Sequence, residues 1–173
     1  ATASRAARER ARARQLKQAQ AEAAAGDYEK AVDTFNKALK FDPHNDDIKS
    51  ERDAAQAKAN ALKLKAEGEA AMAAGDLPTA IEKFLAALKL DPDNKAVTDE
   101  EAEAEKLLRA QELKIQADML MEAEFIDDPT NADVHAGILT PDAGVYREAA
   151  KLYGMAAALD PSDESLPALK KQA

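Results

Sequence analysis

Two stretches of the sequence repeat one arrangement of glycine, apolar residues and proline at a shift of 49 positions. They read GDYEKAVDTFNKALKFDPHN, residues 26–45, and GDLPTAIEKFLAALKLDPDN, residues 75–94. A third copy follows at a further shift of 69 positions, and in every copy a small residue precedes an aromatic residue by four positions and a proline by twelve. A fixed internal spacing of this kind predicts an array of similar structural units. The signature residues are Gly26, Ala31, Phe35 and Pro43 in the first copy, Gly75, Ala80, Phe84 and Pro92 in the second, and Ala149, Tyr153 and Pro161 in the third.

Each copy predicts an antiparallel pair of helices. Gly26 and Gly75 mark the end of a first helix, because glycine enters the left-handed cap conformation at low cost. Asp27 and Asp76 follow at once and are expected to cap the second helix by accepting its free N–H groups. The Asp-Pro pair ends that helix, since proline lacks an N–H donor and disfavours helical geometry before it.

The apolar residues of each copy indicate how a pair is held to the next helix. Ala31 and Phe35 share one helix face, so that a small residue leaves room and the aromatic side chain fills it. Five residues beyond each proline stands one more apolar residue, which is expected to pack the following helix against the pair. These residues are Ile48, Val97 and Leu166.

The composition of the 173-residue chain favours thin helical layers. Hydrophobic residues make up 46% but aromatic ones only 4%, there is no Trp, and many of the hydrophobic residues are Ala, which favours helix and buries little area. No run alternates apolar and polar residues as a half-buried strand would. We therefore expect an all-α fold, an α-solenoid of antiparallel helix pairs with unusually long helices.

These residues resemble the tetratricopeptide repeat (TPR) family, whose signature has Ala, then Phe four residues later, then Pro at the end of the second helix. Gly68 lies twelve residues before Ala80, where the family has a small glycine; the corresponding residue of the first copy is Ala19. The large aromatic residue of the family's first helix is missing. The resemblance implies a divergent, TPR-like α-solenoid that binds other proteins.

The spacing departs from the family's usual 34 residues because the connecting segments are long and helical in composition. Residues 45–74 predict one helix whose first half has Ile48 and then no large apolar residue until Leu62. We expect that half to stand beyond the repeats as a charged arm. In the next long segment, Thr98 and Glu101 predict a capping box.

The repeats divide the chain within a single helical repeat domain, residues 1–173. The insertion in the third repeat is either a tolerated surface loop or a loop that contacts a partner. The expected parts are repeat 1 with a basic N-terminal helical arm at 1–43, repeat 2 at 44–92, repeat 3 at 93–161 with the insertion at about 127–140, and a truncated capping helix at 162–173.

The sequence carries no signature of catalysis or of a bound cofactor. It lacks the phosphate-binding, nucleophile-elbow and metalloprotease motifs, and its two histidines, His44 and His135, both stand in turn-like segments. The absence of Cys excludes disulfides and thiolate metal sites. We therefore expect neither an enzyme, nor a cofactor, nor a metal site.

The charge distribution supplies the candidate partner-binding residues. The net charge of −9 disfavours nucleic acid as a general partner, yet the start of the chain is basic. Its arginines read as a solvated extension, as an arm gripping an acidic protein surface, or as a site for RNA or anionic lipid. The candidates are Arg5, Arg8 and Arg12 on this arm, and Glu67, Glu69, Glu112 and Asp118 in the groove of the first helices, which would suit a basic or mixed partner.

We expect a scaffold or adaptor that docks helices or peptides within a multiprotein assembly. One alternative is a co-chaperone or targeting adaptor that binds a short peptide, although Leu16, Gln20, Ala66 and Glu69 occupy the positions where that class has a basic clamp. A regulatory subunit of an enzyme complex is another. No apolar run approaches a membrane span, so the expected location is cytoplasmic, including a cytoskeletal or other large complex.

Overall fold

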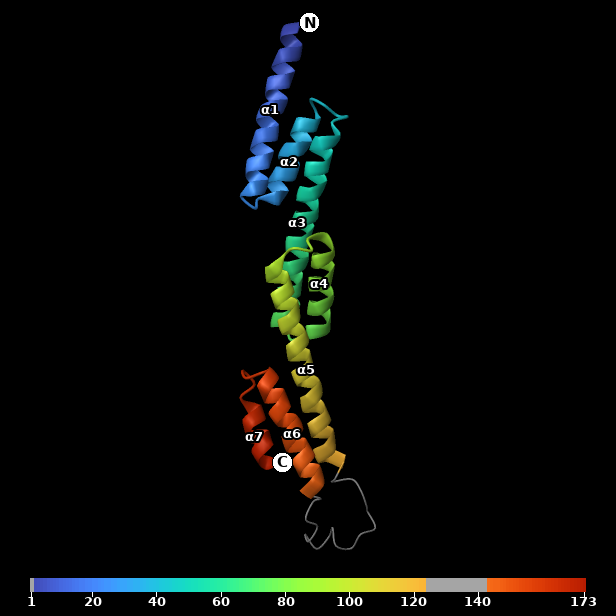
Figure 1. The fold of residues 1–173 in the computed structure, drawn as a ribbon, viewed down its shortest axis with the longest axis vertical. Coiled ribbons are helices and arrows are strands. Elements are labelled where there is room, and N and C mark those ends of the chain that lie inside the picture. The colour runs from blue at the N-terminus through green and yellow to red at the C-terminus, as the bar shows by residue number, and fades with distance from the viewer. Residues whose placement is uncertain (1, 124–142) are drawn as a thin grey trace. The chain divides into compact units, whose positions relative to one another are not determined.

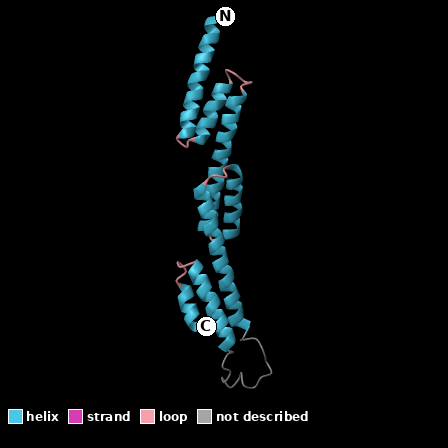
Figure 2. Cartoon of the chain, viewed as in Figure 1, coloured by secondary structure: helices cyan, strands magenta, loops and turns pink. Residues whose placement is uncertain are grey.

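The computed structural model describes residues 2–123 and 143–173, and these form helices joined by turns (Figure 1). No strand occurs in these two ranges, so the expected all-α fold class is confirmed (Figure 2). The predicted insertion at about 127–140 lies outside the described residues. The helices are α1 (Thr2–Ala24), α2 (Tyr28–Leu39), α3 (Asp46–Ala73), α4 (Leu77–Leu90), α5 (Lys95–Ala123), α6 (Ala143–Leu159) and α7 (Ser165–Gln172).

The chain divides into two compact units, Ala1–Asp99 and Glu100–Ala173. The boundary falls within α5, so the first unit holds α1 to α4 and the start of α5. The second unit holds the rest of α5 together with α6 and α7.

Two glycines turn the chain between paired helices in the first unit. Gly26 has φ 84° and Gly75 has φ 79°, the left-handed conformation that the sequence predicted. At the end of α1, the N–H of Gly26 donates to the Ala23 carbonyl at 3.1 Å and the N–H of Asp27 donates to the Glu22 carbonyl at 2.9 Å. The same pair of bonds recurs at Gly75, so both hairpins use one helix-ending motif.

The two aspartates after these glycines behave differently. The Asp76 carboxylate accepts from the Thr79 N–H at 3.2 Å and caps α4 as expected. Asp27 makes no side-chain cap bond; its carboxylate accepts from Lys30 Nζ at 2.8 Å instead. The predicted cap at Asp27 is therefore wrong, because a neighbouring ammonium group competes for the same oxygens.

Asparagine caps the long helices. The N–H of Ile48 donates to Asn45 Oδ1 at 3.0 Å, and the N–H of Val97 donates to Asn94 Oδ1 at 3.4 Å. The predicted capping box of Thr98 and Glu101 is wrong, because α5 already begins at Lys95. Thr98 instead lies in the first turn, where its hydroxyl donates to the Asn94 carbonyl at 3.3 Å.

The first half of α3 packs on α2 and is not a free arm. Ile48 is 1% exposed and Ala55 is 4% exposed, and both belong to one apolar cluster with Phe35. The Gln20 amide of α1 also donates to the Glu51 carboxylate of α3 at 2.9 Å. The expectation of a protruding arm was wrong because, beyond Ile48, alanine at helical spacing buries this face without any further large side chain. The other buried members of the cluster are Ala19, Ala31, Val32 and Ala38.

The second half of α3 packs on α4. Phe84 of α4 is fully buried, and its ring lies directly against Gly68 of α3. Lys83 Nζ of α4 also bonds the Glu67 carboxylate of α3 at 2.8 Å. One long helix therefore serves two hairpins in succession.

The second unit is built on the later part of α5. Leu113 and Ala117 of α5 form an apolar cluster with Tyr153 of α6 and Leu166 of α7. Lys114 Nζ donates to the Asp163 carboxylate at 3.0 Å and so ties α5 to the turn before α7. The apolar residues five positions beyond each proline are all buried, as predicted: Ile48 and Leu166 are 1% exposed and Val97 is fully buried.

Candidate protein-binding surfaces

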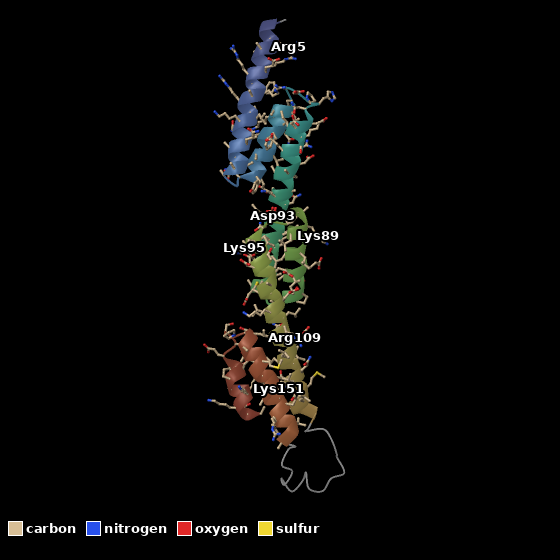
Figure 3. The ribbon with its side chains drawn as sticks, viewed as in Figure 1. Arg5, Lys89, Asp93, Lys95, Arg109 and Lys151 are labelled. Atoms are coloured by element: carbon tan, nitrogen blue, oxygen red, sulfur yellow. The ribbon has the colours of Figure 1, made fainter. Side chains whose placement is uncertain are left out.

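The N-terminal part of α1 projects as an arm. α1 has 23 residues against 12 in its partner α2, and its contacts with the apolar cluster begin only at Leu16. Every described side chain from Ser4 to Arg10 is exposed. Figure 3 labels Arg5 near the N-terminal end of this helix.

Two of the three predicted arm residues have a carboxylate partner. Arg5 bonds Glu9 at 3.3 Å one turn along the same helix, and Arg12 Nη1 bonds Asp42 Oδ2 at 2.6 Å. Hydrogen bonds from Asn45 and then from Arg12 hold the pKa of the Asp42 carboxyl below its usual value. Arg12 thus fastens α1 to the turn after α2. Arg8 is exposed, and no ion pair joins it to another described residue.

The four predicted acidic groove residues each have a partner on a neighbouring turn or helix. The ammonium of Lys83 lowers the pKa of Glu67, mainly through its hydrogen bond, and Glu69 pairs with Lys65. In the second unit, Arg109 donates to Glu112 at 3.0 Å and the Tyr153 hydroxyl donates to Asp118 at 2.7 Å. Glu67 and Glu69 belong to one unit and Glu112 and Asp118 to the other. Their role in binding a partner stays a prediction.

A shallow pocket of about 400 Å³ lies between the start of α2 and the middle of α3. Tyr28 and Ala59 supply apolar surface together with Leu62, which is 44% exposed. Lys58 Nζ stands 5.6 Å from the centre of the Tyr28 ring, a cation–π contact beside the pocket. This site was not predicted from the sequence, although Leu62 is the first large apolar residue after Ile48. The remaining lining residues are Gly26, Asp27, Glu29, Lys30 and Lys63.

A second apolar surface lies on α5 within the second unit. Ile115 is 57% exposed and Met119 is 64% exposed, and their spacing of four places them on one helix face. Leu113 and Ala117 point from the same stretch of helix into the core. In this part of α5, one set of apolar side chains therefore lies in the core and another is exposed to solvent.

The described residues hold no group of three or more His, Asp and Glu side chains arranged for a metal ion. Within the same residues, no helix combines the length and the apolar character needed to cross a bilayer. The predicted absence of a cofactor stays a prediction.

Comparison with known proteins places the family signal at the first hairpin. Residues 12–45 match the tetratricopeptide repeat family, a range that covers the core-packed part of α1, all of α2 and the Asp-Pro turn. The chain therefore contains a tetratricopeptide-type repeat, which confirms the family resemblance and the helical-repeat fold. No curated protein and no solved structure matches the chain. A tetratricopeptide repeat indicates a protein–protein interaction module.

Proposed function

We propose that this protein is a non-enzymatic scaffold or adaptor that docks a helix or peptide within a larger multiprotein assembly of the cytoplasm. The observation that carries the proposal is the pocket beside α3. Its apolar wall remains open to solvent where the first hairpin meets the long helix. Exposed apolar surface rimmed by charged groups is characteristic of protein-binding sites.

The pocket offers both apolar surface and charge to a docking segment. Tyr28 and Leu62 can receive an apolar side chain, while Glu29, Lys30 and Lys63 line the same pocket and can bond polar groups beside it. Fully burying an exposed leucine contributes about 1.5–3 kcal/mol, and because Leu62 is 44% exposed, covering it would contribute roughly half of that to the binding of a peptide.

Cross-linking with mass spectrometry in native extract tests the proposal. The wild-type chain is expected to cross-link to other proteins through Lys58 and Lys63, and Leu62→Asp is expected to lose those cross-links. Leu85→Asp is the matched control, because Leu85 is 45% exposed and does not line the pocket. A chain that remains monomeric in extract, or equal capture by both variants, would contradict the proposal.

A further inference from the structure

The outer face of α1 carries three cations that have no ion-pair partner in the described part of the chain. Arg10, Arg14 and Lys17 are exposed and stand at spacings of four and three residues, so they follow one face of the helix. Among the described residues, no carboxylate pairs with any of them. This distinguishes them from Arg5 and Arg12, which bond Glu9 and Asp42.

Helical periodicity directs these cations away from the rest of the first unit. Leu16, Ala19 and Ala23 form the face of α1 that joins the apolar cluster. At 100° per residue, the mean direction of Arg10, Arg14 and Lys17 lies roughly opposite to that face. A docking segment can therefore reach all three without disturbing the hairpin.

We propose that this outer face binds a carboxylate-rich helix or segment of a partner protein. The inference rests on the proposed function and adds the chemistry of one partner. Acidic side chains repeated every three or four residues on a partner helix would match the spacing of the three cations. The small side chains Ala6, Ala13 and Ala21 between and beside the cations allow a second helix to approach closely.

The same face does not suit nucleic acid or a membrane. The first aromatic residue of the chain is Tyr28, so α1 has no ring on which a base could stack. Ala6, Ala13 and Ala21 give the face no large apolar side chain to insert among lipid tails.

The test uses the full chain and a labelled, alanine-based helical peptide with glutamates at spacings of four and three. A peptide with glutamine in their place is the control for charge. Fluorescence anisotropy is expected to show binding of the glutamate peptide to the chain at about 50 mM salt and no binding at about 300 mM, because salt screens exposed ion pairs. Arg10→Glu, Arg14→Glu and Lys17→Glu combined are expected to weaken binding at least ten-fold.

The matched control reverses the charge of three exposed lysines elsewhere in the first unit, as Lys40→Glu, Lys89→Glu and Lys95→Glu combined. Lys89 and Lys95 are labelled in Figure 3. This variant is expected to bind the glutamate peptide within about two-fold of wild type, and circular dichroism confirms that both variants stay helical. Equal loss in the two variants, or no binding by wild type at about 50 mM salt, overturns the inference.

Tighter binding of a 20-nucleotide RNA or of phosphatidylserine vesicles through the same three residues also overturns it. In native extract, cross-linked partners that persist with the triple α1 variant and vanish with Leu62→Asp would overturn this inference while leaving the proposed function intact.

Discussion

The α3–α4 hairpin and the α5–α6 hairpin place an aromatic residue at the same point of the repeat, but they hold it in different ways. Phe84 is fully buried against Gly68, where a Cβ atom would lie only 2.6 Å from Phe84 Cε1. Tyr153 is 3% exposed and its hydroxyl donates to Asp118 of α5 at 2.7 Å. One ring is fixed by shape and the other by a hydrogen bond.

The repeat pattern therefore specifies where the ring lies, while the opposing helix decides how it is held. A glycine on α3 removes every side-chain atom from the space that Phe84 fills. On α5 a carboxylate accepts the one polar group that Tyr153 brings into the core, since a buried hydroxyl without a partner is costly. Two equivalent hairpins should consequently respond differently to equivalent substitutions.

The largest expected effect is from Phe84→Ala. Removing a fully buried aromatic side chain should lower the free energy of unfolding by about 3–5 kcal/mol. Urea unfolding followed by circular dichroism measures the change, and hydrogen exchange should show faster opening of α3 and α4. A loss below about 1 kcal/mol would show that the ring does not organise this hairpin.

Gly68→Ala and Gly154→Ala form a matched pair with opposite expected signs. At Gly68 the added Cβ meets the buried Phe84 ring, so overpacking should outweigh the gain in helix propensity and cost about 1–2 kcal/mol. At Gly154 the Cβ would come within 3.3 Å only of Lys170 Nζ, the end of a flexible side chain. That substitution should stabilise the chain by about 0.5–1 kcal/mol. Melting temperatures that shift the same way would contradict this account of Gly68.

The hydrogen bond between Tyr153 and Asp118 should make the stability of the protein depend on pH in the alkaline range. Burial first, and then the hydrogen bond and charge of Asp118, raise the pKa of Tyr153 from 10.0 to about 12. Because the folded state favours the neutral phenol, this contribution to stability is complete below pH 10 and is lost as the pH rises through about 12. Tyr153→Phe should cost about 1 kcal/mol at neutral pH and remove this contribution to alkaline unfolding. Ultraviolet absorbance of a Tyr28→Phe, Tyr146→Phe variant, which keeps Tyr153 alone, measures the ionisation directly. A transition near pH 10 would exclude the bond to Asp118.

Local sequence determined the parts of the fold that could be predicted. Glycine at the turns, the Asp-Pro helix ends and the small residue four before each aromatic residue all act within one hairpin. The buried positions of Phe35, Phe84 and Tyr153 followed from them. The burial of Ala55 was not predicted, because a single alanine has too little apolar area to indicate from the sequence that it faces the core.

The candidate site depended on contacts between distant residues. Helical spacing places Arg12 and Arg14 on different faces of α1, but it does not show that Arg12 bonds Asp42, 30 residues away, while Arg14 faces solvent. Only the folded hairpin distinguishes a cation that anchors α1 from one that remains available. The pocket beside Tyr28 likewise forms only where Ala59, Leu62 and Lys63 of α3 lie next to the turn at Gly26. The repeat pattern does not specify this alignment.

The smallest expected effect is that of substituting Lys58, which contacts Tyr28. It concerns the first residue of the second helix in each hairpin of the first unit. Leu77 begins α4 with 3% exposure, whereas the equivalent Tyr28 begins α2 half-buried under Lys58. Lys58→Ala should cost about 0.5 kcal/mol, because an exposed cation–π contact contributes little. Lys58→Arg should retain that contribution, since a guanidinium can stack on the same ring. Both are measured by urea unfolding at constant salt. A loss from Lys58→Ala as large as that from Phe84→Ala would mean that the wall of the pocket, rather than the buried aromatic ring, holds the long helix in place.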